Sequence, residues 1–316
     1  MAGEKRAGKR RKPRRLWLKI TLSVLLVLVL GVGIYAYSIY DNAKGAVNEQ
    51  MHQKVTAIDE KVGKQKIEEK ESLNILLLGV DKRGSDGGRS DALMVLSLDQ
   101  KNEKMQLVSI PRDTRTMIVG KGFEDKINHA YAFGGTDMSI STVEDLLDIE
   151  LDYYVEMNME GLADLIDSLG EITVQNEIDW IDEGFYQEGY HYAEGELTMD
   201  GAQTMGFVRM RHKDPQGDFG RTERQRKVIG AIIDKGASVA SVGKINSVID
   251  VLGNNMATNM DFDDMKDLLL NYANVRRNSS NYMLQGSGTT IDGIYYYQVP
   301  DEELAKVHEM IAEMDS

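Results

Sequence analysis

The sequence predicts a layered α/β domain with a mixed central sheet, preceded by one transmembrane helix. From residue 72 onward, short apolar segments that suit buried strands alternate with segments whose apolar residues recur at helical spacing. Near the N-terminus lies a long stretch without a charge, over residues 20–40. The 316 residues are 42% hydrophobic and 28% charged, an ordinary globular composition. The chain has no cysteine, which excludes disulfides, zinc–thiolate sites and a cysteine nucleophile.

Residues 1–19 form a basic segment, with nine basic side chains and one acidic one. The uncharged residues 20–40 that follow would span about 30 Å as a helix, which matches a bilayer core. Aromatic residues mark both ends of this stretch, as is typical of a membrane interface: Trp17, Tyr35, Tyr37 and Tyr40. Because a basic flank stays in the cytoplasm, we expect a cytoplasmic N-terminus and an extracytoplasmic remainder on a single-pass membrane protein.

Three other interpretations of this region fit less well. A cleaved signal peptide has a shorter apolar core and small residues at its cleavage site. A buried core helix of this length would carry some charge. The basic cluster could contact DNA, but membrane topology and attraction to anionic lipid explain it. The rest of the chain carries a net charge of −22 and should repel nucleic acid, so we expect no nucleic-acid partner.

Residues 41–71 are polar and favour helix, and we expect them to tether the next domain near the membrane. Residues 72–316 contain no repeat and no Pro/Gly break, so one domain is expected. The predicted strands are 73–80, 92–98, 105–110, 153–157, 172–176 and 294–299. The predicted helices are 138–147, 161–169, 221–235, 242–252, 262–272 and 301–314. A tight polar turn at Asn102 and Glu103 predicts a hairpin between the second and third strands.

The arginines of the predicted domain are clustered. Nine of the eleven arginines after the apolar stretch fall in three short segments, 79–91, 109–115 and 209–226. Scattered surface arginines would not concentrate so strongly in an acidic domain. Because arginine binds phosphate oxygens with paired donors, the clustering indicates an anion site.

The first segment combines two carboxylates and two arginines around a glycine-rich loop. Asp81 directly follows the first buried strand, at the strand end where open α/β sheets bind ligands. Arg89 and Asp91 precede the next strand and share a face if extended. Together with Arg83, these groups suit a cation that bridges phosphate oxygens. A polar surface hairpin with ordinary salt bridges would use the same residues, and this segment alone does not decide between the two.

The second segment, Ser109–Arg115, also follows a predicted strand. Pro111 restricts the backbone at the strand exit, so Arg112 is presented at the same edge of the sheet as Asp81. A turn with a solvated charge pair explains this segment at least as well when it is taken alone.

The third segment, residues 209–226, gives the clearest indication of an anion site. If residues 208–211 are extended, Arg209 and Arg211 point to the same side. In the helix that follows, three polar residues continue the buried apolar stripe toward the N-terminus: Arg221, Arg224 and Gln225. Guanidinium groups that face inward at a helix start need an anion there, and helix N-termini already favour one. Solvated arginines would lie on the opposite face.

Taken in order after a single N-terminal span, these segments resemble the LytR–CpsA–Psr family, in particular its LytR-type teichoic acid transferases. The resemblance covers residues 72–316 and depends on five motifs: Gly79-Val-Asp81, Arg89-Ser-Asp91, Ile110-Pro-Arg-Asp113, Lys126-Ile-Asn-His-Ala-Tyr131, and the block from Arg209 to Gln225. It implies an α–β–α sandwich with an apolar tunnel for a polyprenyl chain and a charged mouth for its diphosphate.

The resemblance also implies an activity and its residues. The protein would move an anionic glycopolymer, wall teichoic acid or a similar polymer, from a polyprenyl-diphosphate lipid to a peptidoglycan hydroxyl outside the membrane of a Gram-positive type cell. Asp81 and Asp91 would hold Mg²⁺. The diphosphate would be bound by Arg89, Arg112, Arg209, Arg211, Arg221 and Gln225, to which the segments above add Arg83 and Arg224. We expect Asp91, Arg89 and Arg221 to act in catalysis, with Asp91 accepting the hydroxyl proton.

Two other functions would use the same residues. A diphosphatase would hydrolyse the lipid-linked donor with water as the acceptor, and a non-enzymatic regulator would only sense polyprenyl phosphate. The inward arginines fit all three functions, whereas the paired aspartates favour the enzymes. Among the histidines, we interpret His129 as a hydrogen-bonded structural residue, and His212 could assist phosphate binding. The tyrosines at 186–192 and 295–297 are interpreted as packing or surface aromatics rather than a sugar platform.

Overall fold

The computed structural model describes residues 34–81, 88–238, 242–272 and 274–315. The chain divides into two compact units, Met1–Lys44 and Gly45–Ser316. The described part of the first unit is helical. Within the described residues, no helix is both long enough and apolar enough to cross a bilayer. The basic segment 1–19 and residues 20–33 of the predicted span lie outside the described residues.

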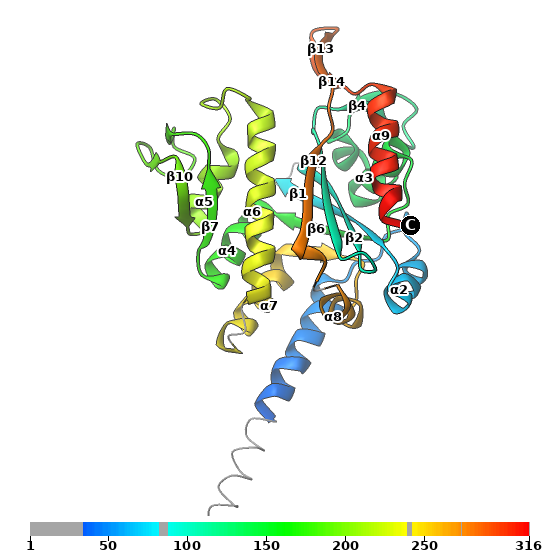
Figure 1. Cartoon of the computed structure of the whole chain (residues 1–316), viewed down its shortest axis with the longest axis vertical. Coiled ribbons are helices and arrows are strands. Elements are labelled where there is room, and N and C mark those ends of the chain that lie inside the picture. Colours follow the sequence, from blue (N-terminus) through cyan, green and yellow to red (C-terminus); the bar gives the residue numbers. More distant parts are fainter. Residues whose placement is uncertain (1–33, 82–87, 239–241, 273, 316) are drawn as a thin grey trace, which may run out of the picture. The chain divides into compact units, whose positions relative to one another are not determined.

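The second unit is built on a six-stranded mixed sheet. Its strands are β1 Leu73–Asp81, β2 Arg89–Asp99, β3 Lys104–Ile110, β6 Tyr153–Asn158, β11 Met256–Thr258 and β12 Asn278–Met283. They lie in the order β11-β6-β1-β2-β3-β12 (Figure 1). The β1–β6 and β3–β12 pairs are parallel, and the other three pairs are antiparallel. The predicted α/β class with a central mixed sheet is confirmed, and β1, apolar on both faces, lies inside the sheet.

The first three strands form an antiparallel meander, as predicted. Glu103 adopts a left-handed conformation (φ 52°) in the tight turn between β2 and β3. Strand β2 begins at Arg89 rather than at the predicted residue 92, because its first residues pair with the end of β1. The register shifts there: Gly79 pairs with Ala92, and Val80 pairs with Ser90. Asp91 is therefore the extra residue of a β-bulge.

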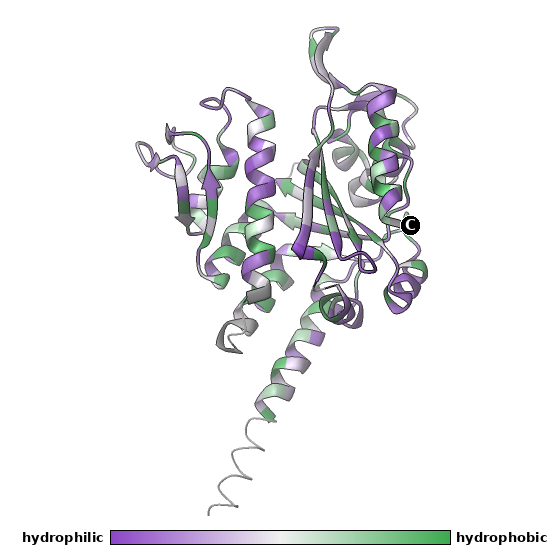
Figure 2. Cartoon of the chain, viewed as in Figure 1, coloured by the Kyte–Doolittle hydropathy of each residue, from purple (hydrophilic) through white to green (hydrophobic). Residues whose placement is uncertain are grey.

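Helices cover both faces of the sheet. On one face lie α3 (His129–Leu147) and α9 (Asp301–Ala312), and on the other lie α4 (Met159–Leu169) and α6 (Asp218–Ser238) (Figure 1). The central strands are mostly hydrophobic in Figure 2, as a doubly covered sheet requires. Helix α3 begins earlier than predicted and is kinked at Gly134 and Gly135, where the φ of 65° at Gly135 favours glycine.

A smaller lobe follows α4. Strand β7 (Ile172–Asn176) pairs with β10 (Gly195–Met199), and β8 (Trp180–Ile181) pairs with β9 (His191–Tyr192). Its core includes Trp180, which stacks on Tyr192 with 4.7 Å between ring centroids.

Helix α5 (Gly201–Arg209) completes the lobe and was not predicted. Asp200 and Gln203 cap its start reciprocally, a pattern that is visible in the sequence. The expectation that 208–211 is extended was wrong, because Val208 and Arg209 form the last turn of α5.

The end of the sheet at which β1 begins is closed by α2 (Glu60–Glu69), α7 (Val242–Asn255), α8 (Phe262–Asn271) and the short turns η1 (Ala46–Met51) and η2 (Val275–Arg277). Ile67 and Tyr272 pack there with Leu73 and Ile75 of β1. Residues 45–71, which the sequence suggested as a tether, belong to the same compact unit as the sheet.

Two β-hairpins lie beyond the opposite end of the sheet. They are β4 (Arg115–Met117) with β5 (Glu124–Lys126), and β13 (Ser287–Ile291) with β14 (Ile294–Gln298). A bridge between Thr114 and Tyr297 joins the two hairpins just after β3 ends. The chain closes with the short turn η3 (Glu313–Asp315). Only β14 was predicted. Strands β4 and β5 have three residues each and leave almost no periodic signal, and β13 is mostly polar.

Candidate active site

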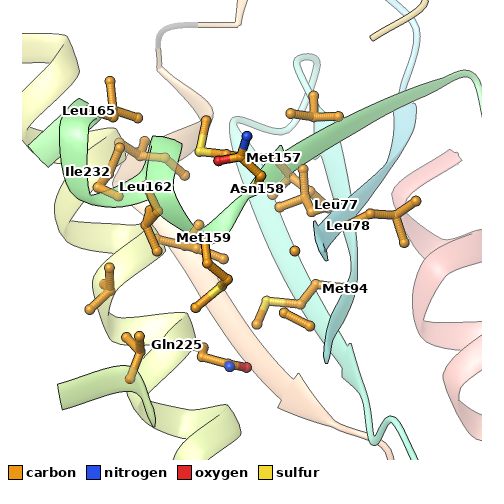
Figure 3. Close-up of a pocket in the computed structure, with 18 residues that line it drawn as sticks. Leu77, Leu78, Met94, Met157, Asn158, Met159, Leu162, Leu165, Gln225 and Ile232 are labelled. Carbon is orange, nitrogen blue, oxygen red and sulfur yellow. The ribbon is translucent and has the colours of Figure 1, made fainter. Parts of the chain in front are cut away.

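An apolar cavity of about 270 Å³ lies between the sheet and the helices α4 and α6 (Figure 3). Its walls include Leu77 of β1, Met94 of β2 and Leu162 of α4. Of the described residues that line it, only Asn158 and Gln225 have polar side chains. A cavity with this lining suits an apolar chain, because a polar ligand would lose its hydrogen bonds to water there.

Helix α6 connects this cavity to a group of charged residues. Ile232 and Val228 line the cavity, and Gln225 lies at one end of it (Figure 3). Arg221 precedes Gln225 by one helical turn and so lies on the same face of α6. The Arg221 side chain is only 11% exposed. The inward face predicted from the sequence is therefore present at Arg221 and Gln225.

The charged group lies where β1 and β3 end. Arg112 Nη1 donates a hydrogen bond of 2.6 Å to Asp91 Oδ1. Arg112 Nε lies 3.8 Å from Asp218 Oδ2, and Asp218 Oδ1 lies 2.8 Å from Arg221 Nη2. Asp218 is the first residue of α6, a position where the helix dipole favours negative charge. Asp218 therefore links the two arginines, and Asp91 anchors the first of them.

The two arginines respond differently to this environment. Burial acts to lower the pKa of Arg112, but the hydrogen bond to Asp91 and the neighbouring carboxylates outweigh it, so the pKa is raised. Burial lowers the pKa of Arg221; the nearby charge of Arg112 adds to this effect, and Asp218 only partly offsets it. The positive charge on Arg221 is thus less well compensated within the protein than that on Arg112.

Each of these two guanidinium groups has one N–H donor that no acceptor among the described residues satisfies. Among the described residues, Arg112 Nε and Arg221 Nε are buried and find no hydrogen-bond acceptor. A buried donor without an acceptor costs about 1–3 kcal/mol, and native structures leave few of them. Two such donors within one charged group fit a site that is completed by an anion.

The β-bulge at Asp91 places two carboxylates at the same end of the β1–β2 pair. Asp81 pairs across the strands with Arg89, and the bulged Asp91 follows Arg89 by two residues. No group of three or more His, Asp or Glu side chains that could hold a metal ion occurs in the described part of the chain. Mg²⁺, however, usually binds one or two carboxylates together with substrate phosphates and water. Asp81 and Asp91 are two carboxylates at one end of this strand pair.

A model of the LytR_cpsA_psr family matches residues 33–313. The chain belongs to this family. It is 47% identical over 283 residues to a Bacillus anthracis (strain CDC 684 / NRRL 3495) protein named polyisoprenyl-teichoic acid–peptidoglycan teichoic acid transferase TagU, which covers 89% of this chain and 91% of the relative. It is similar to the crystal structure of B. subtilis TagU, with a TM-score of 0.63 and 39% identity over 78% of this chain and 98% of that one. It is also similar to TagT bound to LIIa-WTA, with a TM-score of 0.68 and 29% identity over 84% and 96% of the two chains.

In this LytR_cpsA_psr member, Arg224 lies apart from the charged group. Its Nε donates to the Phe207 carbonyl at 3.0 Å, and its terminal nitrogens donate to the Met210 carbonyl and the Asp214 carboxylate. The guanidinium also lies 5.5 Å from the centre of the Trp180 ring. These contacts hold the smaller lobe against α6 and engage all three nitrogens. The apolar stripe in the sequence correctly predicted that Arg224 points inward, but it did not predict which groups Arg224 contacts.

The remaining predicted arginines differ in position. Arg211 is half-buried, and its charge helps to lower the pKa of Arg221, after the larger effect of burial. Arg209 ends α5 and is half-buried, and Arg89 is exposed at the start of β2. Arg83 lies outside the described residues.

Three residues that the sequence did not single out belong to this site. Asp218 links the arginines, and Asp113 Oδ1 receives Lys126 Nζ at 2.7 Å while its Oδ2 lies 3.9 Å from Arg112 Nε. Asp218 could have been found, because it precedes Arg221 by three residues and the two share a helix face. Asp113 and Lys126 stand inside the family motifs, but only the fold brings those motifs together.

Aromatic side chains flank the same site. Lys126 Nζ lies 5.9 Å from the centre of the Tyr295 ring, and Tyr295 is 46% exposed. Tyr297 is buried and packs edge-on against Phe219 of α6 at 5.2 Å. His129 is held by Asp125 through a contact of 2.7 Å, which agrees with the expected structural histidine.

Proposed function

We propose that the protein is a membrane-anchored extracytoplasmic phosphotransferase that moves teichoic acid, or a similar anionic glycopolymer, from a polyprenyl-diphosphate carrier to peptidoglycan. The observation that carries this proposal is the position of Arg221 and Gln225. Both lie on the helix face that continues into an apolar cavity, so a ligand with a long apolar tail and an anionic head fits the site. The Bacillus anthracis relative, which is 47% identical to this chain, is named as a transferase of this kind. That name supports the same activity for this chain.

The donor would bind with its polyprenyl chain in the cavity and its diphosphate among Arg112, Arg211 and Arg221. The two buried Nε donors would then gain oxygen acceptors, and the positive charge on Arg221 would gain a counter-charge. Arginine suits this role because its fork binds phosphate oxygens in pairs. Arg89, Arg209 and, in the segment beyond the described residues, Arg83 remain proposed contacts to the rest of the diphosphate.

Mg²⁺ is the metal that this site would use, held by Asp81 and Asp91. It would supply charge neutralisation on the diphosphate oxygens. The arginines of the site hold and orient the diphosphate, and Asp218 fixes Arg112 and Arg221 relative to each other. Positioning and electrostatic stabilisation of this kind supply most of the catalysis in phosphoryl transfer.

The reaction forms one bond and breaks one. An acceptor hydroxyl oxygen of peptidoglycan attacks the phosphorus that carries the glycopolymer, and the bond from that phosphorus to the bridging oxygen breaks. Polyprenyl phosphate leaves with the bonding electron pair. Asp91 is our choice to accept the hydroxyl proton, because its carboxylate is held at the site by Arg112.

The cellular location is part of the proposal. Residues 20–40 would span the membrane, with residues 1–19 in the cytoplasm and the sheet domain outside. Several apolar and aromatic side chains in the described end of this stretch are exposed, as a membrane-embedded surface would be: Ile34, Tyr35, Tyr37 and Tyr40.

Transfer of a synthetic polyprenyl-diphosphate-linked saccharide to peptidoglycan fragments, by the full chain in detergent with Mg²⁺, tests the proposal. Asp91→Ala and Arg221→Ala serve as site variants. We expect a covalent product that is lost in both variants. Saccharide phosphate released without a product would identify a diphosphatase, and lipid binding with neither product would identify a regulator.

A further inference from the structure

Helix α8 ends in two adjacent leucines that face solvent. Leu269 and Leu270 are each 72% exposed, more than any other large apolar side chain described in residues 45–315. The preceding Leu268 instead packs inward, against the cluster that contains Tyr272 and Val275. Nothing in the fold of the described residues requires two leucines at this position, so the exposed pair indicates a contact with something outside the domain.

Basic side chains lie on the two elements that follow or adjoin this end of α8, although the protein as a whole is acidic. Arg276 and Arg277 form the exposed part of η2, which follows α8 directly. The β2–β3 turn adjoins η2 through a hydrogen bond of 3.0 Å from Asn278 Nδ2 to the Glu103 carbonyl, and it adds two exposed lysines, Lys101 and Lys104.

Two of the three acidic residues of α8 lie close to a lysine of the same helix. Lys266 lies 2.7 Å from Asp263 and 3.9 Å from Asp267. The β2–β3 turn itself contains one acidic residue, Glu103. We call the surface of Leu269, Leu270, Arg276, Arg277, Lys101 and Lys104 the α8 tip; it combines exposed apolar groups with positive charge, as membrane-interfacial surfaces do.

The chain enters the domain beside the first turns of α8. In η1, Ala46, Val47 and Met51 pack with Phe262 and Met265 of α8. Asn48 Oδ1 also accepts a hydrogen bond of 2.9 Å from the Phe262 backbone nitrogen. The proposed span ends at Tyr40, and the six residues from there to Ala46 cover at most about 20 Å. If residues 20–40 span the membrane as proposed, this short connection keeps α8 close to the membrane surface.

The charged group of the candidate active site lies at the other end of the sheet. Strand β1 begins at Leu73, which packs with the α8 region, and ends at Asp81 beside the site. Its nine residues span about 30 Å. Figure 1 shows α8 at one end of the sheet and the β13–β14 hairpin beyond the other.

We propose that the α8 tip docks on the anionic bilayer surface, with Leu269 and Leu270 in the interfacial layer and Arg276 and Arg277 among the lipid phosphates. This inference rests on the proposed membrane span. It orients the domain: the charged group faces away from the bilayer, and the cavity runs back along α6 from Gln225 toward the membrane side. A lipid chain would thus extend from the bilayer side toward the diphosphate site, which faces the wall.

The absence of cysteine allows a site-specific test in the full chain. Leu269→Cys, Leu270→Cys and, as the matched control beyond the other end of the sheet, Thr290→Cys are each labelled with an environment-sensitive fluorophore. The labelled chains are incorporated into nanodiscs that contain phosphatidylglycerol, with and without lipids that carry a quencher near the headgroups. We expect blue-shifted emission and at least twofold quenching at both leucine positions, and neither change at position 290.

A charge-reversed background provides the second arm. Arg276→Glu combined with Arg277→Glu should reduce the quenching at position 270, and 0.5 M salt should reduce it in the unmodified background, because screening weakens attraction to anionic lipid. Water-like, unquenched emission at positions 269 and 270 in chains that do enter nanodiscs would overturn the inference and leave the span intact. Chains that fail to enter nanodiscs at all would overturn the span itself, and the inference with it.

Discussion

Two arginines on α6, three residues apart, allow a direct test of which guanidinium serves a ligand and which serves the fold. Arg224 donates to two backbone carbonyls and to Asp214, and its side chain is 6% exposed. Arg221 lies near Asp218 and has a buried Nε without an acceptor among the described residues. Replacing each with methionine removes the charge and keeps a flexible apolar side chain. We predict opposite outcomes for the two variants.

The magnitudes follow from what each substitution leaves behind. Arg224→Met leaves the Asp214 carboxylate buried without its partner, which costs about 3–5 kcal/mol. For a domain of this size that loss lowers Tm by about 6–20 °C. Arg221→Met removes a positive charge that burial and Arg112 already disfavour, so we expect stability within about 1 kcal/mol of wild type. It should instead lower kcat/KM by about 10²–10³, as loss of a donor to developing charge does.

Thermal unfolding by circular dichroism and transfer of a labelled saccharide, measured on the same full-length preparations, separate the two effects. Arg221→Lys is the matched control, because it keeps the charge and loses the fork; we expect it to recover part of the activity. Our reasoning is refuted if Arg221→Met lowers Tm as much as Arg224→Met does, or if Arg221→Met transfers saccharide at the wild-type rate.

Three further predictions follow from the site and the core. Asp91→Asn should retain the fold and lower the transfer rate at least about 100-fold. Chelation by EDTA should abolish transfer by the wild-type protein until Mg²⁺ is restored. Undiminished transfer in either assay would contradict the assignment of the metal site. Ile232→Trp should fill part of the cavity and weaken binding of a long-chain polyprenyl phosphate, measured by titration, while inorganic pyrophosphate binding is unchanged; equal loss of both ligands would argue against a tail site. Burial raises the pKa of Asp264 to about 6, so the native state holds this proton more tightly than the unfolded chain does, and it loses stability as pH rises from about 4 to 6. Asp264→Asn should therefore be more stable than wild type by about 1–2 kcal/mol at pH 7, measured by urea unfolding. A stability gain that persists at pH 4 would show a different cause.

The local patterns of the sequence predicted much of the sheet and one side of the site. The apolar run in β1, the polar turn before Lys104 and the strand exit at Pro111 are short-range signals, and the structure contains the elements that they predict. The buried stripe of α6 likewise placed Arg221 and Gln225 inside. Where these signals were weak, the prediction failed: α5 was missed although its capping pair Asp200 and Gln203 was visible, and Arg209 was misplaced as a result.

Local sequence patterns could not predict which groups each arginine contacts. Arg221 and Arg224 have the same side chain, the same helix and the same inward face, and only the packing of the smaller lobe assigns Arg224 to Phe207, Met210 and Asp214. The bulge at Asp91 also depends on how β2 pairs with β1, which neither strand specifies alone. The same holds for Asp113 and Lys126, which are in separate motifs and meet only in the folded chain.

By itself, then, the sequence determined the α/β class, the central strands, the inward face of α6 and the resemblance to a family. It could do so because strand and helix periodicities, turn residues and motifs are properties of neighbouring positions in the chain. The tertiary structure alone decided where the apolar cavity lies, which arginine stabilises the fold, how Asp218 joins Arg112 to Arg221, and that α8 and the charged group lie at opposite ends of the sheet. Those features are contacts between distant segments, and a contact is defined only once packing has selected one arrangement of the elements.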